Sequence, residues 1–164
     1  IYGVSAFGLS NQTDLSRGEA KELIDTYYDT YPKLRTYMSD QVDFARDHGY
    51  VQTVLGRRRY LKDINSPNAI VRGAAERNAV NAPIQGSAAD IIKIAMINIY
   101  NKLALGNFKT KMLLQVHDEL VFDVYKPELA AMKTLIKTEM EQAFIMDVPF
   151  DVEVDTGLNG LEAH

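Results

Sequence analysis

The segment Gln115–Leu120, with the sequence QVHDEL, places an imidazole and two adjacent carboxylates inside an otherwise apolar stretch. β-branched and aromatic residues on both sides predict two short strands, with His117, Asp118 and Glu119 at or near the turn of a hairpin. The two acids would then crowd one small volume, which is costly beside a buried hairpin unless a cation or another partner neutralises their charge. The segment alone leaves two interpretations open, a divalent-metal site and a solvated polar turn.

Three hydrogen-bonding side chains, Arg77, Asn81 and Gln85, recur every four residues within a helical pattern. This spacing places them on one face of the helix, where they could bind an edge of hydrogen-bond acceptors. A solvated helix face is the alternative. Pro83 and Gly86 lower helix stability in the same stretch, so we expect the helix to be interrupted near Pro83 and then to resume. Their presence indicates a constraint on shape.

The net charge of −4 argues at first against a nucleic-acid-binding protein. Between Arg57 and Arg77, however, six basic residues stand against two acidic ones. A basic patch on an acidic body is typical of one anion-binding face, and a solvated basic loop is the alternative.

The composition limits the class of protein. With 164 residues, 46% of them hydrophobic, the chain can form one domain with a buried core. It has no apolar run of about 18 residues, so no membrane span is expected. The absence of cysteine excludes a disulfide framework and a thiolate metal site, and it is compatible with a reducing cytoplasm. No signal-peptide pattern opens the chain. It begins with Ile1 rather than Met, which indicates a fragment or a processed product.

Capping residues, prolines, glycines and hydrophobic periodicity predict the order of the elements. Ser16 and Glu19 form a capping-box pattern that begins a helix at Arg17, and Pro32 divides the helical stretch that ends near Gly49. The other expected elements are strands at 50–54 and 58–61, a long helix after a Ser66–Pro67 cap, a hairpin at 110–125, a helix at 127–144 and a strand at 148–154. Several helices with a small antiparallel sheet, made of the hairpin and the C-terminal strand, define an α+β fold.

Three segments resemble motifs of the family A DNA polymerases, the bacterial DNA polymerase I type, and occur in the same order and spacing. They are Tyr2–Gly3, Asn81–Asp90 and Gln115–Leu120, and the resemblance extends over essentially the whole chain. It implies a C-terminal fragment of a polymerase with a right-hand architecture. Residues 1–65 would derive from the fingers and residues 66–164 would form part of the palm, within one partial domain.

The resemblance implies roles for the residues of the hairpin. Asp118 would bind the catalytic divalent cations, Glu119 would support the metal site less directly, and His117 would lie beside the primer terminus. In phosphoryl transfer of this kind, two Mg²⁺ ions about 4 Å apart activate the primer 3′-hydroxyl and stabilise the leaving pyrophosphate. Mg²⁺ prefers oxygen ligands, so His117 is not counted among the metal ligands.

The resemblance also implies contacts with DNA. Arg77, Asn81 and Gln85 would touch the minor-groove edge of the primer–template, where acceptors are present on every base pair. Tyr2 and Gly3 would lie beside the nascent base pair and the templating position. The implied partners are primer–template DNA, a deoxynucleoside triphosphate and the rest of the polymerase chain, in a monomeric bacterial enzyme of the cytoplasm without membrane association.

The cluster of Arg57, Arg58 and Arg59 is expected to bind backbone phosphates and to give salt-dependent affinity for DNA. A structural hairpin with surface arginines is an equally good interpretation of each of them.

The sequence also departs from the family pattern. No Asp-Tyr-Ser stretch with the other metal-binding aspartate precedes Tyr2, and the fingers arginine and lysine that hold the triphosphate are missing, as are the thumb and any exonuclease domain. One carboxylate cluster cannot hold two metals in the geometry that in-line displacement requires. We therefore expect the isolated 164 residues not to extend a primer.

Two functions of other classes remain open. A non-catalytic DNA-binding module would use Arg77, Asn81 and Gln85 without the acids. A Mg²⁺-dependent nuclease would use His117 as a base. The polymerase interpretation requires Asp118 to face the same cleft as the three helix residues.

Overall fold

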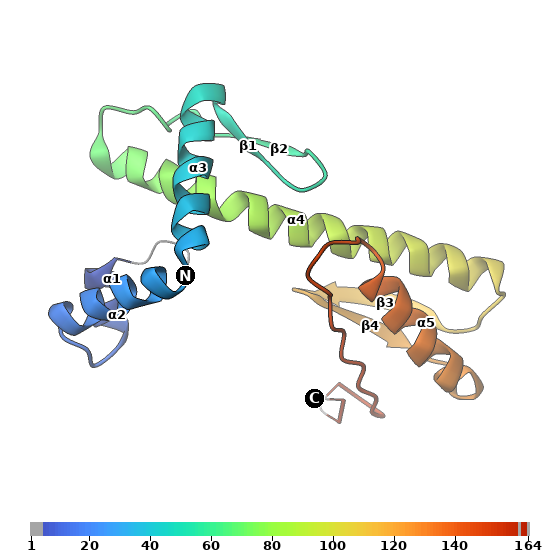
Figure 1. The fold of residues 1–164 in the computed structure, drawn as a ribbon. Coiled ribbons are helices and arrows are strands. Elements are labelled where there is room, and N and C mark those ends of the chain that lie inside the picture. The colour runs from blue at the N-terminus through green and yellow to red at the C-terminus, as the bar shows by residue number, and fades with distance from the viewer. Residues whose placement is uncertain (1–4, 161, 164) are drawn as a thin grey trace. The chain divides into compact units, whose positions relative to one another are not determined.

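The computed structural model describes residues 5–160, 162 and 163, and Figure 1 shows their helices and strands. The elements are α1 (Ala6–Gln12), α2 (Arg17–Thr30), α3 (Pro32–His48), β1 (Tyr50–Gln52), β2 (Arg58–Tyr60), α4 (Ala69–Leu105), β3 (Lys111–Val116), β4 (Glu119–Asp123), the 3-10 turn η1 (Lys126–Glu128) and α5 (Leu129–Glu141). β1 pairs with β2 and β3 pairs with β4, both antiparallel. The predicted α+β fold class is confirmed.

The chain forms two compact units, Ile1–Ser87 and Ala88–His164, whose boundary falls inside α4. Each unit has its own apolar cluster, as described below. The predicted division into a fingers part (1–65) and a palm part (66–164) stays a prediction.

The boundaries of α2 and α3 follow from local signals that the sequence displays. Ser16 Oγ accepts a hydrogen bond from the Glu19 amide at 3.3 Å, and the Glu19 carboxylate accepts one from the Ser16 amide at 2.9 Å. Hydrogen bonding of the Glu19 carboxylate with the Ser16 side chain and then with the Ser16 backbone lowers the pKa of Glu19. Pro32 occupies the first turn of α3, and Gly49, with a φ of 76°, ends that helix in the left-handed conformation that glycine adopts without strain. The predicted capping box and helix ends are confirmed.

The first unit packs the β1–β2 hairpin against α3 and the first half of α4. Its cluster of buried side chains consists of Ala45, Val51, Leu61, Ile64, Ala75 and Ala79. The register pairs Val51 with Arg59 and Tyr50 with Tyr60, so alternate residues of β1 face the core and its opposite side. Val51, only 1% exposed, is the strand residue that joins the hairpin to this core.

Helix α4 begins and continues differently from the prediction. Asn68, rather than Ser66, caps the helix, because its Oδ1 accepts hydrogen bonds from the amides of Ile70 (2.9 Å) and Val71 (3.4 Å). The helix then runs without interruption through Pro83. A proline removes one donor and crowds one carbonyl, so the helix is continuous in spite of a local loss of stability.

In the second unit, the β3–β4 hairpin packs against the second half of α4 and against α5. Ile99, Leu103, Met132 and Ile136 form the buried cluster, and partly buried side chains of the hairpin and its flanks, including Leu120, Phe122 and Val124, pack against it. On β4 the partly buried residues alternate with exposed ones, as expected for a strand with one covered face.

The base of this hairpin is fastened by a carboxylate. Glu128 accepts hydrogen bonds from the amides of Lys109 (2.9 Å) and Thr110 (3.0 Å) and from the Thr110 hydroxyl (2.7 Å). These bonds, with the one from the Lys109 backbone as the largest cause, lower the pKa of Glu128. Thr110 itself is buried and also accepts a bond from the Tyr125 amide, so the two ends of the hairpin are tied together.

The predicted strand at 148–154 is wrong: no residue of that stretch is part of a strand. Side chains of α5 form hydrogen bonds with the backbone of this segment instead. Lys137 Nζ donates to the Val152 carbonyl at 2.8 Å, and the Glu141 carboxylate accepts from the Val152 amide at 3.3 Å. Alternating apolar residues therefore describe an extended segment bound to a helix, not a sheet strand.

No helix in the described part of the chain is both long and apolar enough to cross a membrane.

Candidate functional site

The acidic segment forms a tight hairpin turn, as predicted. Val116 pairs with Glu119, which leaves His117 and Asp118 as the two residues of the turn. His117 has a φ of 54°, a left-handed conformation that is unfavourable for a residue with a Cβ atom. The Gln115 side chain donates to the His117 carbonyl at 2.9 Å and supports this conformation. A strained residue at such a turn is a reason to look for function there.

Asp118 in the turn and Glu119 at the start of β4 are both exposed to solvent. Within the part of the chain that the structure describes, Asp118 has no hydrogen bond or ion pair, so its carboxylate oxygens are available to a ligand. The burial cost that drew attention to these charges in the sequence is small here, because the apolar residues of β4 turn inward and leave the acids outside.

The donor set of this turn suits part of a magnesium site. Mg²⁺ is commonly held by one or two carboxylates together with substrate phosphates and water, rather than by a complete protein cage. Asp118 and Glu119 supply two such carboxylates from adjacent positions. Among the described residues, no group of three or more His, Asp or Glu side chains could hold a metal ion. The turn can therefore contribute to a shared site but cannot enclose an ion by itself.

The predicted row of Arg77, Asn81 and Gln85 lies on α4, in the first unit. Arg77 and Gln85 are exposed and Asn81 is partly buried. The Oδ1 atom of Asn81 is buried and has no hydrogen-bond partner among the described residues. Unpaired buried acceptors are unusual because each costs about 1–3 kcal/mol.

The structure brings the arginine cluster next to Gln85. A small cavity of about 90 Å³ between the β1–β2 hairpin and α4 is lined by Gln85 and by the arginines of the hairpin, Arg57, Arg58 and Arg59. Arg57 Nη2 donates to the Gly86 carbonyl at 3.1 Å. The Arg58 guanidinium lies over the Tyr50 ring, 4.4 Å from its centroid. Both predicted arginines thus have structural contacts as well as a positive charge.

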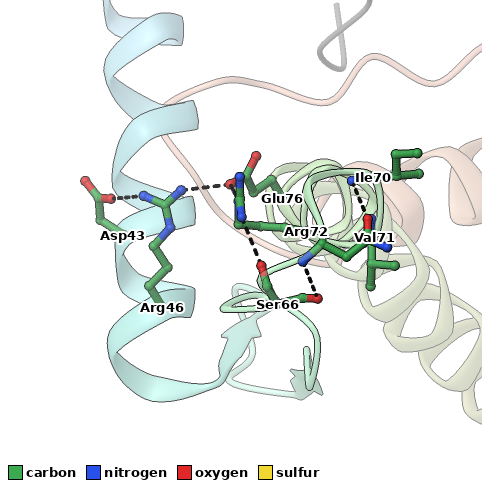
Figure 2. Close-up of polar contacts among 8 residues, drawn as sticks. Asp43, Arg46, Ser66, Ile70, Val71, Arg72 and Glu76 are labelled. Carbon is green, nitrogen blue, oxygen red and sulfur yellow. Dashed lines mark hydrogen bonds and ion pairs between the residues drawn. The ribbon is translucent and has the colours of Figure 1, made fainter.

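Another arginine of the basic stretch is engaged in the fold, as Figure 2 shows. The Glu76 carboxylate lies 2.7 Å from Arg46 Nη2 and 3.7 Å from Arg72 Nε. Arg72 also donates to the Ser66 carbonyl at 2.9 Å, and Arg46 contacts Asp43 at 3.3 Å. This network joins α3 to the start of α4, so Arg72 does not belong to the free basic surface that the charge count predicted.

Two residues outside the predicted site, Ser87 of α4 itself and Tyr37 of α3, bind carbonyls of α4 near its proline. Ser87 Oγ donates to the Pro83 carbonyl at 2.5 Å and accepts from the Val54 amide at 2.9 Å. Tyr37 Oη, from α3, donates to the Val80 carbonyl at 3.1 Å. A serine four residues after a proline in a helix is a recognisable signal for the first contact, but no signal in the sequence indicates the second.

The remaining predicted residues are not tested. Tyr2 and Gly3 lie outside the described residues. The acidic turn belongs to the second unit and the row on α4 to the first, so the expectation that Asp118 faces the same cleft as Arg77, Asn81 and Gln85 stays a prediction.

Comparison with known proteins gives a consistent result. The family description "DNA polymerase family A" matches residues 1–162. DNA polymerase I of Streptococcus pneumoniae (serotype 4, strain TIGR4) is 53% identical over 163 residues, which cover 99% of this chain and 19% of that protein. DNA polymerase I of Caldicellulosiruptor bescii is 50% identical over 162 residues, with the same two coverages. DNA polymerase I of Mycobacterium tuberculosis is 49% identical over 156 residues, 95% of this chain and 17% of that protein. The chain therefore spans about a fifth of the length of these curated relatives.

A solved structure agrees with them. It is the POL domain of Pol1 from M. smegmatis in complex with a DNA primer–template and a dNTP. Its TM-score is 0.87 at 50% sequence identity, over 90% of this chain and 26% of that one.

Proposed function

This chain belongs to DNA polymerase family A, and we propose that it is the C-terminal part of a DNA-directed DNA polymerase that adds deoxynucleotides to a primer 3′ end. Its partners would be primer–template DNA, a dNTP and the remainder of the parent chain, in a monomeric enzyme of replication and repair in the bacterial cytoplasm. The observation that carries the proposal is the two-residue turn that exposes the Asp118 carboxylate from a well-packed hairpin.

Asp118 is the proposed metal ligand, with Glu119 as its supporting acid. Bound Mg²⁺ would supply charge neutralisation at the phosphates and activation of the primer hydroxyl. The contribution of this chain is positioning. The turn fixes where the carboxylate lies, and the apolar face of β4 prevents the hairpin from rotating it inward. We propose that His117 lies beside the primer terminus, because it shares the same short turn.

Arg77, Asn81 and Gln85 are the proposed contacts with the minor groove. Acceptors at similar positions on all base pairs allow such a row to sense the shape of a correct pair without reading its sequence. The exposure of Arg77 and Gln85 supports this role.

Positive charge on the β1–β2 hairpin would strengthen DNA binding. Arg57 and Arg58 are the proposed phosphate contacts, and the cavity that they line with Gln85 supports the assignment. Tyr2 and Gly3 are proposed to contact the nascent base pair and the template on the basis of family membership alone.

The 164 residues are proposed to be inactive without the rest of the parent chain. Two metal ions need more carboxylates than this turn provides, and the described residues contain no group of three potential ligands.

The test replaces Asp118 by asparagine in the complete parent polymerase, with Asp123→Asn, at the far end of β4, as the control in the same hairpin. Asp118→Asn removes the charge but keeps the shape, and primer extension should fall by about 10³-fold or more, as expected when several kcal/mol of transition-state stabilisation are lost. Asp123→Asn should extend primers at the wild-type rate. Retained activity in Asp118→Asn would favour a DNA-binding module. Metal-dependent DNA cleavage that is lost in His117→Ala would favour a nuclease.

A further inference from the structure

Helix α4 contains a proline, yet it stays continuous. Pro83 has no amide hydrogen to donate to the carbonyl of the preceding turn, so the helix is locally weakened at this point. Side chains from elsewhere in the first unit bind the carbonyls around it: Tyr37 binds that of Val80 and Arg57 binds that of Gly86. The weakened segment is thus held from outside the helix.

The tip of the β1–β2 hairpin provides most of this support. Ser87 Oγ accepts from the Val54 amide and donates to the Pro83 carbonyl, and so joins the hairpin to the helical turn that follows the proline. The hairpin also lies very close to Gly86, since a Cβ atom there would be 2.6 Å from Thr53 Cγ2. Any other residue at this position would have to displace the Thr53 side chain.

The tip itself is closed by its own hydrogen bonds. The Thr53 amide donates to the Arg57 carbonyl at 2.9 Å, and the Gly56 amide donates to the Thr53 carbonyl at 2.9 Å. The Arg57 amide donates to Thr53 Oγ1 at 3.2 Å, and Gly56 has a φ of 78°. Because these bonds restrain the conformation of the tip, its contacts with α4 can restrain the helix backbone as well.

Gln85 is the residue between these attachments. The contacts at Pro83, Gly86 and Ser87 flank it on both sides along the chain, while its own side chain is exposed. The contacts therefore determine the backbone from which Gln85 projects, and they leave its amide available to a ligand.

We propose that the tip of the β1–β2 hairpin positions Gln85 for its contact with the primer–template, with Ser87 and Arg57 as the positioning residues. This inference rests on the proposed function of Gln85. A side chain that distinguishes correct from incorrect pairs by shape must be held to within about half an ångström, and a proline-weakened helix does not provide that alone. The hairpin supplies the missing rigidity.

The test uses the complete parent polymerase and the neutral variant Ser87→Ala. The measurement is the ratio of extension efficiencies from a matched and a mismatched primer end. Ser87→Ala should lower this ratio by roughly three- to tenfold, the factor that corresponds to one hydrogen bond. Thr36→Ala is the matched control, because Thr36 also donates to the carbonyl of a proline four residues earlier, Pro32, but no strand is attached to it. It should leave the ratio unchanged.

A double-mutant comparison separates positioning of Gln85 from a general loss of structure. Gln85→Ala should lower the ratio at least as far as Ser87→Ala does, and adding Ser87→Ala to Gln85→Ala should lower it no further. Gly86→Ala should act like Ser87→Ala, because its new Cβ displaces Thr53. Neither neutral variant should change the salt dependence of DNA binding. Fully multiplicative effects of Ser87→Ala and Gln85→Ala would overturn the proposal.

The proposed DNA contact of Gln85 and the attachment of the hairpin to α4 can be tested separately. If Gln85→Ala leaves the ratio at its wild-type value, the proposed function of Gln85 is wrong. The attachment is then read from hydrogen exchange of the Val54 amide, which should accelerate by about fivefold or more in Ser87→Ala when its hydrogen-bond partner is removed. An unchanged exchange rate would overturn the attachment itself.

Discussion

The two hairpins of this chain differ in which part is held by the rest of the protein. β1–β2 has three-residue strands, and side-chain and backbone hydrogen bonds attach its tip to α4. β3–β4 has longer strands, an apolar cluster beneath one face and a turn that projects into solvent. The first hairpin therefore has short strands and a tip that is bound to α4. The second hairpin has strands that pack on an apolar cluster and a tip that is exposed to solvent.

This difference matches what each hairpin would have to do. An attached tip can support another element, here the stretch of α4 around Gln85. An exposed tip can offer its own side chains, here Asp118, to a ligand. Both hairpins rest on an apolar cluster, but only the tip of the first is also attached to a helix by hydrogen bonds.

The largest expected effect concerns the apolar cluster of the second unit. Met132, 1% exposed, packs beneath the β3–β4 hairpin, and Met132→Ala should destabilise this unit by about 2–5 kcal/mol. Hydrogen exchange of the β3 and β4 amides should accelerate accordingly, while the β1 and β2 amides keep their rates. Met146→Ala, at a position that is 42% exposed, is the control. Equal acceleration in both hairpins would remove the distinction between them.

A smaller effect is expected from the charge of the first hairpin. Arg58→Gln should lower the slope of log affinity against log salt by about one in the parent polymerase, as expected for the loss of one phosphate contact. Arg35→Gln removes the same charge from α3 and should leave the slope unchanged. Fluorescence titrations of primer–template DNA at several salt concentrations measure both. A slope that does not change in Arg58→Gln would make this arginine purely structural, through its stacking on Tyr50.

The smallest effect concerns the base of the second hairpin at low pH. Hydrogen bonds from the Lys109 backbone and from Thr110 hold the pKa of Glu128 below its ordinary value of 4.5. The stabilisation is therefore present above the unfolded-state pKa, and it is lost as the pH falls through the lower folded-state value. Glu128→Gln should lose this contribution at neutral pH and show a flatter decline of stability below pH 4.5.

Unfolding midpoints of the wild type and the variant between neutral and acidic pH measure this effect, with Glu22→Gln on the surface of α2 as the control. The two curves should converge at the acid end. Parallel curves would mean that Glu128 does not fasten the hairpin through its charge.

The sequence predicts well what is determined locally. The capping box at Ser16, the break at Pro32, the left-handed Gly49 and the hairpin turn at His117 and Asp118 all follow from side-chain chemistry within a few residues. These signals predicted most of these element boundaries, whereas the exposure of the acids at the turn was one of two interpretations left open.

Features that depend on distant partners were missed. Helix α4 continues through Pro83, and side chains from α3 and the first hairpin bind carbonyls on both sides of it; no local pattern contains that information. The segment at 148–154 has the alternation of a strand, yet Lys137 and Glu141 of α5 bind its backbone in place of a neighbouring strand. The attachment of Arg57 to Gly86 likewise joins residues 29 positions apart.

The brevity of the turn between β3 and β4 has a consequence for how this protein can change over evolution. With only His117 and Asp118 outside the ladder, an insertion of one residue after the turn would shift the alternation of β4 by one position. Glu119 would then point toward the apolar cluster, and Leu120 would point to water. Substitutions can accumulate along both strands, but we expect the length of this turn to be held constant.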